Sequence, residues 1–204
     1  MAISSTKEKL LKAALDLFSE KGYEATSVDE IAASVGLKGP SIYKYFKGKE
    51  ALFQEISELS EEEYRKGMVL DSDPTELVHT AEQLKQFSIE QVIFTINNET
   101  IHKLRRVQSM EQFRNSYIRE KATLHQHSTI TGLFTRIFES LINEGKIEPC
   151  DPALLAQLYS APIALMIQLY DREPERKNEV MMNIMDHIDF FIDKFFKKDT
   201  RPND

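Results

Sequence analysis

Apolar and polar positions recur along most of the chain at the three- and four-residue spacing of amphipathic helices. Near the start, Ser5 and Glu8 carry the sequence signature of a capping box. Lys21 and Gly22 are a cation and a glycine of the kind that ends a helix. The apolar positions between these two signals are Leu10, Leu11, Ala14, Leu15, Leu17 and Phe18. The pattern predicts a first amphipathic helix ending at Lys21.

Two shorter helices are predicted next. Ser27 and Glu30 form a second capping signature, and the apolar stripe that follows allows about two turns of helix up to Gly36. Gly39 and Pro40 then read as an N-cap followed by a proline at the first helical position. The third helix is expected over residues 40–46, with Ile42 and Phe46 as its buried face.

Two short helices joined by a glycine-containing turn are typical of the helix-turn-helix, whose second helix enters the major groove of DNA. Residues 1–50 carry eight lysines against seven acidic residues, whereas the remainder carries 18 cations against 26 acids. The segment from Lys38 to Lys49 also holds Lys44 and Lys47 and no acidic residue, which favours a polyanion there. A generic three-helix bundle with a solvated lysine-rich loop fits the spacing equally well, because lysines also suit a helix end.

The rest of the chain is predicted to be helical too, since seven glycines and seven prolines leave long stretches without breakers. Gly145 should close one long helix, and Pro152 and Pro174 should open later ones. The expected helices cover residues 48–66, 75–87, 89–96, 99–114, 115–144, 152–170 and 173–198. The fold class is therefore all-α, with about nine to ten helices.

The last two predicted helices are more apolar than one buried stripe requires. In the first, the apolar residues are Leu154, Leu155, Leu158, Tyr159, Ile163, Leu165, Met166 and Leu169. In the second, they are Met181, Met182, Ile184, Met185, Ile188, Phe191, Ile192, Phe195 and Phe196. Two apolar faces need two partners, so the pattern allows either a four-helix interface with a second copy or burial within one domain.

The run from Tyr23 to Ala32, followed by the run from Val35 to Leu52, resembles the DNA-binding segment of the TetR family. The resemblance covers about the first 53 residues. It implies a helix-turn-helix DNA-binding domain at 1–50 and a larger helical ligand-binding and dimerisation domain at 51–204. It also implies a homodimer through the last two long helices. The implied function is a transcriptional repressor that a small molecule releases from a near-palindromic site on double-stranded DNA.

The resemblance also implies DNA-binding roles for individual residues. Thr26, Ser27, Tyr43 and Lys49 would contact phosphate, while Lys38, Ser41 and Lys44 would face the groove. Where the family commonly has a glycine close to DNA, this sequence has Pro40, which lacks a backbone donor. The expected DNA-binding residues are Thr26, Ser27, Lys38, Gly39, Pro40, Ser41, Tyr43, Lys44 and Lys49.

A pocket for the small-molecule ligand is expected on the middle helices, because pockets are mostly apolar with a few placed polar groups. The candidate ligand-binding residues are Phe94, His102, Met110, Phe113, Tyr117, Phe134 and Phe138. Each of them alone also suits an ordinary core. The alternative function is an architectural DNA-bound protein that presents an interaction surface and needs no cavity.

Catalytic signatures are missing from the sequence: it has no G-x-S-x-G, H-E-x-x-H, C-x-x-C or glycine-rich phosphate loop. We therefore expect no enzyme, no cofactor and no metal site. The longest apolar run, residues 161–167, is too short to cross a bilayer, and no signal peptide is apparent. The single Cys150 excludes an internal disulfide, so a cytoplasmic, nucleoid-associated protein is expected.

Overall fold

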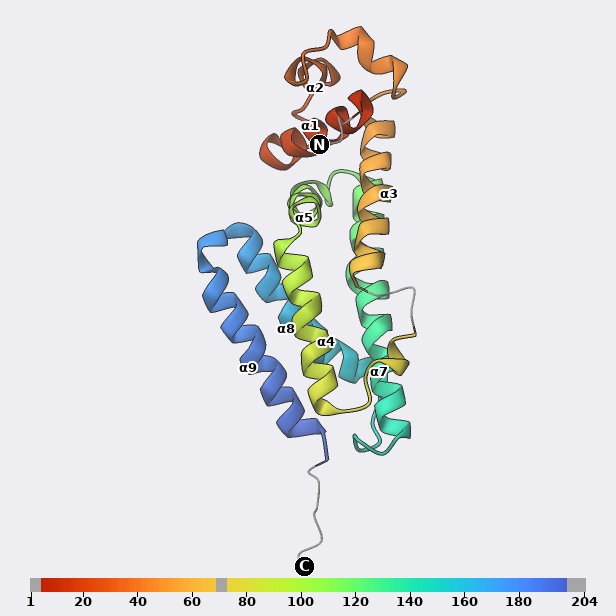
Figure 1. Ribbon diagram of the computed structural model, residues 1–204, viewed down its shortest axis with the longest axis vertical. Coiled ribbons are helices and arrows are strands. Elements are labelled where there is room, and N and C mark those ends of the chain that lie inside the picture. The colour runs from red at the N-terminus through yellow and green to blue at the C-terminus, as the bar shows by residue number, and fades with distance from the viewer. Residues whose placement is uncertain (1–4, 69–72, 198–204) are drawn as a thin grey trace, which may run out of the picture. The chain divides into compact units, whose positions relative to one another are not determined.

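The computed structural model describes residues 5–68 and 73–197, and helices make up nearly all of the regular structure in these ranges (Figure 1). The all-α prediction is confirmed. The described α-helices are α1 (Thr6–Lys21), α2 (Val28–Ser34), α3 (Lys49–Gly67), α4 (Ala81–Asn97), α5 (Glu99–Glu111), α6 (Ser116–Thr123), α7 (Ile130–Asn143), α8 (Pro152–Arg172) and α9 (Lys177–Phe195). Short helical turns are η1 (Gly39–Lys44), η2 (Pro74–Glu76), η3 (Leu124–Thr129) and η4 (Pro174–Arg176).

The chain forms two compact units that interleave in sequence. The N-terminal unit combines Met1–Lys66 with Asn97–Ala122, and the C-terminal unit combines Gly67–Ile96 with Thr123–Asp204. Helices α5 and α6 thus pack with the helix-turn-helix although they follow it by tens of residues. The functional division after residue 50 stays a prediction.

Capping chemistry sets the ends of the first two helices. The Oγ of Ser5 accepts the Glu8 N–H at 3.2 Å, and the Glu8 carboxylate accepts the Ser5 N–H at 3.0 Å, so the predicted capping box is present. The Oγ of Ser27 accepts the Glu30 N–H at 3.1 Å. The carboxylate of Glu30 pairs with Lys21 instead of the Ser27 N–H, so the second capping box has only the hydrogen bond to Ser27 Oγ.

The third helix differs from the prediction. Residues 39–44 form the 3₁₀ helix η1, and its N-cap position is Lys38 rather than Gly39. The Ser41 N–H donates to the Lys38 carbonyl at 2.8 Å, which is the tighter bonding of a 3₁₀ turn. A segment of six residues can form few α-helical hydrogen bonds, so it gains little from an α-helix over the tighter 3₁₀ turn.

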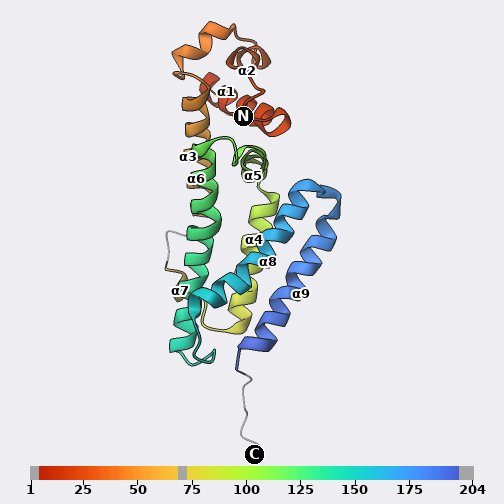
Figure 2. The same ribbon diagram turned by 180° about the vertical axis from the view of Figure 1, so that it is seen from behind.

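The core of the N-terminal unit is built around aromatic rings. The ring of Phe18 lies 5.2 Å from that of Tyr23 and 5.8 Å from that of Phe53. Val107 of α5 and Ile118 of α6 are fully buried in the same cluster. Figure 2 shows α6 beside α3, in agreement with the Lys121–Glu61 ion pair at 2.8 Å. Shared burial of apolar side chains therefore packs the first two helices and η1 against α3, α5 and α6.

The C-terminal unit packs α4, α7, α8 and α9 around Tyr159, which is fully buried. The Tyr159 ring lies 4.9 Å from Phe134, 5.4 Å from Phe138 and 4.6 Å from Phe191. Helix α8 contacts α7 on one side and α9 on the other (Figures 1 and 2). Burial desolvates the Tyr159 phenol and raises its pKa, so it stays a neutral core group.

Several predicted helix boundaries were wrong. The segments 75–87 and 89–96 form η2 and the single helix α4, which begins after Thr80, whose Oγ1 accepts the Gln83 N–H at 3.2 Å. The predicted helix 115–144 is helical from Ser116 to Asn143, but a π-helical turn, η3, separates α6 from α7. Helix α5 ends at Glu111, three residues early, and the segment 173–198 is divided between η4 and α9. Residue 198 lies outside the described residues.

Helix α8 is the one helix in the described ranges that is long and apolar enough to span a membrane by length and composition. Core helices of soluble proteins meet the same criteria. Here Leu155, Tyr159 and Ile163 are buried within the C-terminal unit, whereas Leu154, Leu158 and Leu165 are exposed. Helix α8 therefore has one apolar face that is buried in the core and a second row of apolar residues that is exposed to solvent.

Candidate nucleic-acid interface

The segment around η1 presents polar and cationic side chains to solvent. Its apolar residues Ile42 and Phe46 are buried, whereas most of the remaining positions are exposed. Tyr43 is 60% exposed, and Lys38 and Lys44 are also exposed. This arrangement separates a packing face from a face that is free to meet a ligand.

Two glycines shape this segment. Gly36 adopts φ +76°, a left-handed conformation that turns the chain after α2. A Cβ on Gly39 would lie 1.8 Å from Oδ1 of Asp29, so η1 approaches α2 closely at this residue. Next to it, Pro40 is exposed and Ser41 is half-buried. Gly39 therefore has a structural reason to be glycine that is independent of DNA.

Thr26 and Ser27 occupy different environments. Thr26 is 1% exposed, and its hydroxyl donates to the Gly22 carbonyl at 2.9 Å. Ser27 is exposed at the N-cap of α2. In this structure the Thr26 side chain supports the turn between α1 and α2, and Ser27 has solvent access. The predicted phosphate contacts of both residues stay predictions.

Lys49 is engaged within the protein. Its Nζ donates to the Tyr23 carbonyl at 2.8 Å and lies 4.3 Å from the centre of the Tyr23 ring. Burial raises the pKa of Tyr23 to about 12, and the nearby carboxylates of Glu50 and Glu24 act in the same direction. The ring is therefore neutral and available as a cation–π partner. Lys49 joins the start of α3 to the turn after α1, and its predicted phosphate contact stays a prediction.

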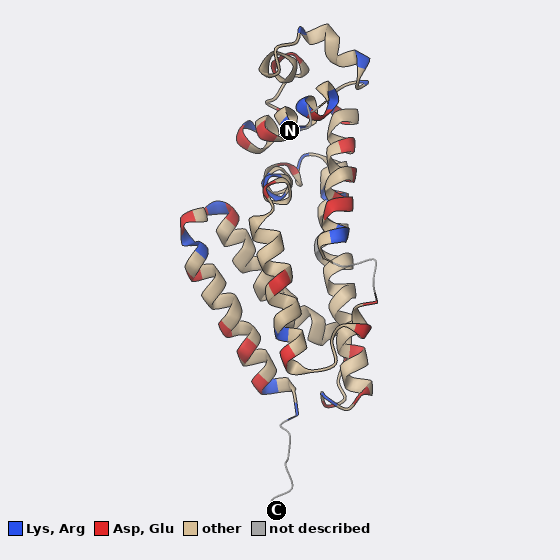
Figure 3. Ribbon diagram, in the orientation of Figure 1, with Lys and Arg blue, Asp and Glu red and all other residues tan. Residues whose placement is uncertain are grey.

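Charge is distributed unevenly over the N-terminal unit (Figure 3). From Lys38 to Lys49 the chain has four lysines and no acidic residue, whereas α3 beyond them carries several glutamates. A local cationic segment on an acidic protein attracts phosphate where it is exposed and avoids general coating by DNA. The geometry thus suits binding to a polyanion at η1.

The expected ligand residues are spread over both units. Phe134 and Phe138 are buried in the aromatic cluster of the C-terminal unit, and Phe94 is half-buried on α4. Tyr117 packs against Phe53 at 6.2 Å in the core of the N-terminal unit. The other three belong to the same unit: His102 is half-buried, Met110 is 40% exposed and Phe113 is 85% exposed. Their ligand-binding roles stay predictions.

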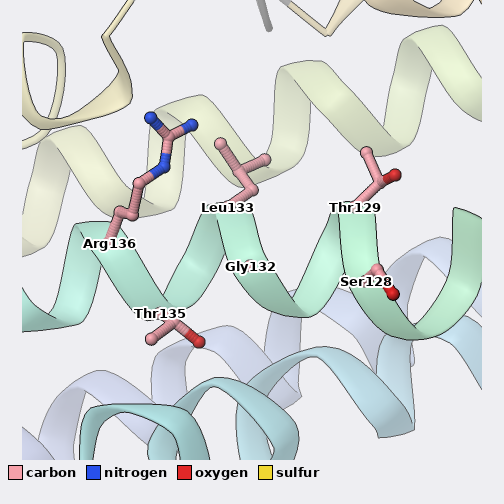
Figure 4. Close-up of a pocket in the computed structure, with 6 residues that line it drawn as sticks. All are labelled: Ser128, Thr129, Gly132, Leu133, Thr135 and Arg136. Atoms are coloured by element: carbon pink, nitrogen blue, oxygen red, sulfur yellow. The ribbon is translucent and has the colours of Figure 1, made fainter. Parts of the chain in front are cut away.

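An open pocket of about 560 Å³ runs along η3 and the start of α7 (Figure 4). Leu133 and Arg136 project from one side of the helix there, and Thr135 projects from the other. The six lining residues are Ser128, Thr129, Gly132, Leu133, Thr135 and Arg136. They include none of the seven residues that the sequence suggested.

Polar groups in the C-terminal core were missed by the sequence reasoning. The Ser88 hydroxyl is hydrogen-bonded to the Tyr159 hydroxyl at 2.6 Å, and the buried Oε1 of Gln91 has no hydrogen-bond partner in the described part of the chain. A signal was present, because Leu84, Ser88 and Gln91 recur at helical spacing on one face of α4. Polar residues on an otherwise apolar face mark positions that need a polar partner.

The short helix α2, the turn at Gly36 and the exposed, lysine-bearing η1 have the arrangement of a helix-turn-helix. Residues 10–56 match the sequence model of the bacterial regulatory proteins of the tetR family. The HTH-type transcriptional regulator YhgD of Bacillus subtilis is 30% identical over 195 residues, which cover 88% of this chain and 92% of YhgD. The chain therefore belongs to the TetR family of transcriptional regulators.

Other similar proteins agree with this family. The biofilm operon negative regulator IcaR of Staphylococcus aureus is 43% identical over 49 residues, 24% of this chain and 26% of IcaR. SmeT, the repressor of a Stenotrophomonas maltophilia multidrug efflux pump, has the same fold, with a TM-score of 0.70 at 20% identity over 96% of this chain and 93% of SmeT. The structure of a SmeT–triclosan complex matches with a TM-score of 0.73 at 19% identity, over 96% of this chain and 94% of SmeT.

Family membership confirms three expectations from the sequence. The chain is a DNA-binding transcriptional regulator, it has the helix-turn-helix with a helical C-terminal region, and it is not an enzyme. As a bacterial transcriptional regulator it works in the cytoplasm, where its DNA is.

Proposed function

We propose that the protein is a homodimeric repressor that binds a near-palindromic operator through η1 and is released by a small apolar molecule. The observation that carries this proposal is the exposed set Lys38, Tyr43 and Lys44 on a segment without acidic residues. Two such segments, held about 34 to 36 Å apart by a dimer, fit successive major grooves on one face of the duplex.

We assign the DNA contacts by solvent access. Ser27 and Tyr43 are the proposed phosphate contacts, and Lys38, Ser41 and Lys44 are the proposed groove-facing residues. Gly39 and Pro40 shape the start of η1, because Gly39 lies against Asp29 and Pro40 limits the backbone. Thr26 and Lys49 make internal hydrogen bonds in the DNA-free protein, so any phosphate contact from them requires those bonds to be shared or exchanged.

The DNA-binding proposal can be tested without a known operator. A duplex is selected from a random-sequence pool with the purified protein, and affinity is measured by fluorescence anisotropy. Lys44→Ala should weaken binding about ten-fold, as expected for a groove contact, and Tyr43→Phe about five-fold for one lost hydrogen bond. Lys146→Ala, an exposed lysine of the C-terminal unit, serves as the control. If neither Lys44→Ala nor Tyr43→Phe weakens binding, η1 is not the reading helix.

The proposed dimer uses the exposed apolar row of the last two long helices. Leu154, Leu158 and Leu165 lie four and seven residues apart on α8 and are 51–62% exposed. On α9, Met182 and Phe190 are 60% and 61% exposed. Pairing of this surface with its copy would remove these exposed apolar side chains from water in an isologous four-helix interface.

The proposed ligand site is the aromatic core of the C-terminal unit. The Phe134, Phe138 and Tyr159 rings supply apolar surface, and the unpartnered Oε1 of Gln91 supplies an acceptor for a ligand hydroxyl or N–H. Triclosan, an apolar phenol present in a SmeT complex, is a suitable first probe within a panel of apolar compounds. A compound that releases the protein from the selected duplex should act less well on Gln91→Leu. If no compound in the panel releases DNA, the architectural alternative is favoured.

A further inference from the structure

The turn that joins α1 to α2 is held by two side chains from other helices, Lys49 of α3 and Glu111 of α5. The Tyr23 backbone N–H donates to Oε1 of Glu111 at 2.9 Å. The Tyr23 carbonyl accepts from Nζ of Lys49 at 2.8 Å. Both backbone polar groups of Tyr23 therefore bond to residues that lie 88 and 26 positions away in the sequence.

Glu111 is an unusual residue for its position. It is the last residue of α5 and is 4% exposed. Its second oxygen, Oε2, is buried and has no hydrogen-bond partner in the described part of the chain. A buried carboxyl group with half of its acceptors unused costs stability compared with an apolar side chain. Among the described contacts of this carboxyl group, the hydrogen bond that it accepts from the Tyr23 N–H offsets the cost.

The backbone on the other side of the contact is matched to this carboxylate. Gly22 adopts φ +91°, a left-handed conformation that favours glycine. A Cβ added to Gly22 would lie 2.9 Å from Oε1 of Glu111, closer than packed atoms tolerate. The positive φ is therefore what favours glycine at this position, and the Glu111 carboxylate lies so close to the turn that an added Cβ would have to displace it.

Helix α5 is also attached to α1 at a second point. Nζ of Lys103 lies 2.6 Å from Oδ1 of Asp16, about two turns along α5 from Glu111. With both attachments in place, α1 and the turn after it cannot shift relative to α5 without breaking a charged contact. The turn leads directly into Ser27 and α2, on which η1 packs.

We propose that Glu111 is a positioning residue for DNA binding: through the Tyr23 N–H it fixes the orientation of α2 and η1 on α5. This inference rests on the proposed dimeric operator binding. In a dimer, the orientation of each reading segment on its own helical support determines which half-site spacing the two copies can reach together. Loss of the Glu111–Tyr23 hydrogen bond would let α2 and η1 change orientation. Both the affinity for the operator and the discrimination between half-site spacings should then fall.

The experiment uses the full-length protein and three duplexes: the selected operator, and the same sequence with one central base pair inserted or removed. Glu111→Gln keeps an acceptor oxygen of the same reach and should behave as the wild type. Glu111→Met keeps the length and removes the acceptor. It should bind the selected operator about ten-fold more weakly, as expected when only about a tenth of the molecules hold the binding-competent orientation, and should discriminate less between the three duplexes.

Two further variants complete the design. Glu111→Asp keeps the charge but withdraws the carboxylate by one methylene, so it should lose discrimination like Glu111→Met and replaces that variant if it fails to fold. Glu120→Met, at an exposed glutamate of α6, is the matched control and should leave all three affinities unchanged.

The outcomes separate the inference from the function on which it rests. If Glu111→Met and Glu111→Asp keep the wild-type ratio of affinities over the three duplexes, even with lowered melting temperatures, Glu111 is merely structural and the inference is overturned. If the wild type selects no duplex, or binds the three duplexes equally, the proposed operator binding itself is wrong and the inference falls with it.

Discussion

Gly22 and Gly132 differ in backbone conformation, since Gly22 has a positive φ and Gly132 is helical. Gly22 has φ +91° and faces Glu111, whereas Gly132 lies inside α7 with nothing within 4 Å of an added Cβ. Gly22→Ala should destabilise the protein by about 1–3 kcal/mol through backbone strain and a steric clash. Gly132→Ala should stabilise it by about 0.5–1 kcal/mol, because alanine restricts the unfolded chain. Urea unfolding measures both, and a shift of the two variants in the same direction would contradict this account.

His79 and Glu144 form an ion pair at 2.9 Å in the C-terminal unit. The hydrogen bond to Glu144 raises the pKa of His79, and the same bond lowers the pKa of Glu144. A raised histidine pKa contributes stability that is complete below the unfolded value, about 6.5, and is lost as the pH rises through the folded value.

His79→Gln should therefore lower the melting temperature more at about pH 5.5 than at about pH 8.5, since Glu144 is ionised at both. The effect should be small, because both side chains are partly exposed and screened by solvent. Melting curves of the two proteins at each pH provide the measurement. An equal difference at both pH values would show that the pair does not stabilise the fold.

At single residues, the sequence shows which side chains could meet DNA but not which internal atoms compete for them. Lys49 and Thr26 fit the family pattern for phosphate contacts, yet their polar atoms bond to the carbonyls of Tyr23 and Gly22 in this structure. Glu111 gave no local signal, because its partner lies 88 residues away. Long-range hydrogen bonds depend on packing that local patterns do not encode.

At the level of helices, the predictable features are those that depend on neighbouring residues. The predicted helix starts after Ser5 and at Pro152 were correct because each is set by a cap that bonds within three residues. At Pro152 the N-cap residue is Asp151, whose Oδ1 accepts the Ala153 N–H at 2.9 Å. The start of α4 was also readable, since Thr80 and Gln83 have the spacing of a capping box and the sequence reasoning overlooked it. The π-helical turn η3 has no comparable local signature.

The N-cap of α2 allows helix stability and DNA binding to be separated. Ser27→Ala removes the acceptor for the Glu30 N–H and should cost about 0.5–2 kcal/mol of stability. Ser27→Asp keeps a good cap and adds a negative charge, so stability should be retained while operator affinity falls several-fold by repulsion from phosphate. Thermal melts and anisotropy titrations measure the two effects. Unchanged affinity of Ser27→Asp would place Ser27 away from the backbone of DNA.

At the scale of the whole molecule, the exposed row on α8 gives the sharpest test of assembly. Leu158→Glu combined with Leu165→Glu should yield monomers in sedimentation velocity, because two charges cannot be buried in an apolar interface. Operator affinity should then fall about a hundred-fold or more, as the second half-site contact is no longer intramolecular.

Leu59→Glu is the control, since Leu59 is 50% exposed on α3 of the N-terminal unit. It should leave both the oligomeric state and the affinity unchanged. A Leu158→Glu, Leu165→Glu protein that remains dimeric would remove α8 from the interface.

The chain-wide arrangement was harder to foresee than its parts. The resemblance to the TetR family implied a functional division near residue 50, which stays a prediction. The compact packing units are discontinuous in sequence, because Val107 and Ile118 are buried with the helix-turn-helix core. Helical periodicity predicts that a face is buried, but not which distant helix covers it.

The twelve residues from Lys38 to Lys49 hold four lysines and no acidic residue on a chain with a net charge of −7, and this small excess of positive charge bears on how such a regulator searches a genome. Few phosphates are neutralised at each random encounter, so few counterions are released and the protein leaves non-specific sequence quickly at cellular salt. The acidic remainder repels the duplex and shortens those visits further. A long residence at one place then has to come from matched base contacts and correct spacing rather than from bulk attraction.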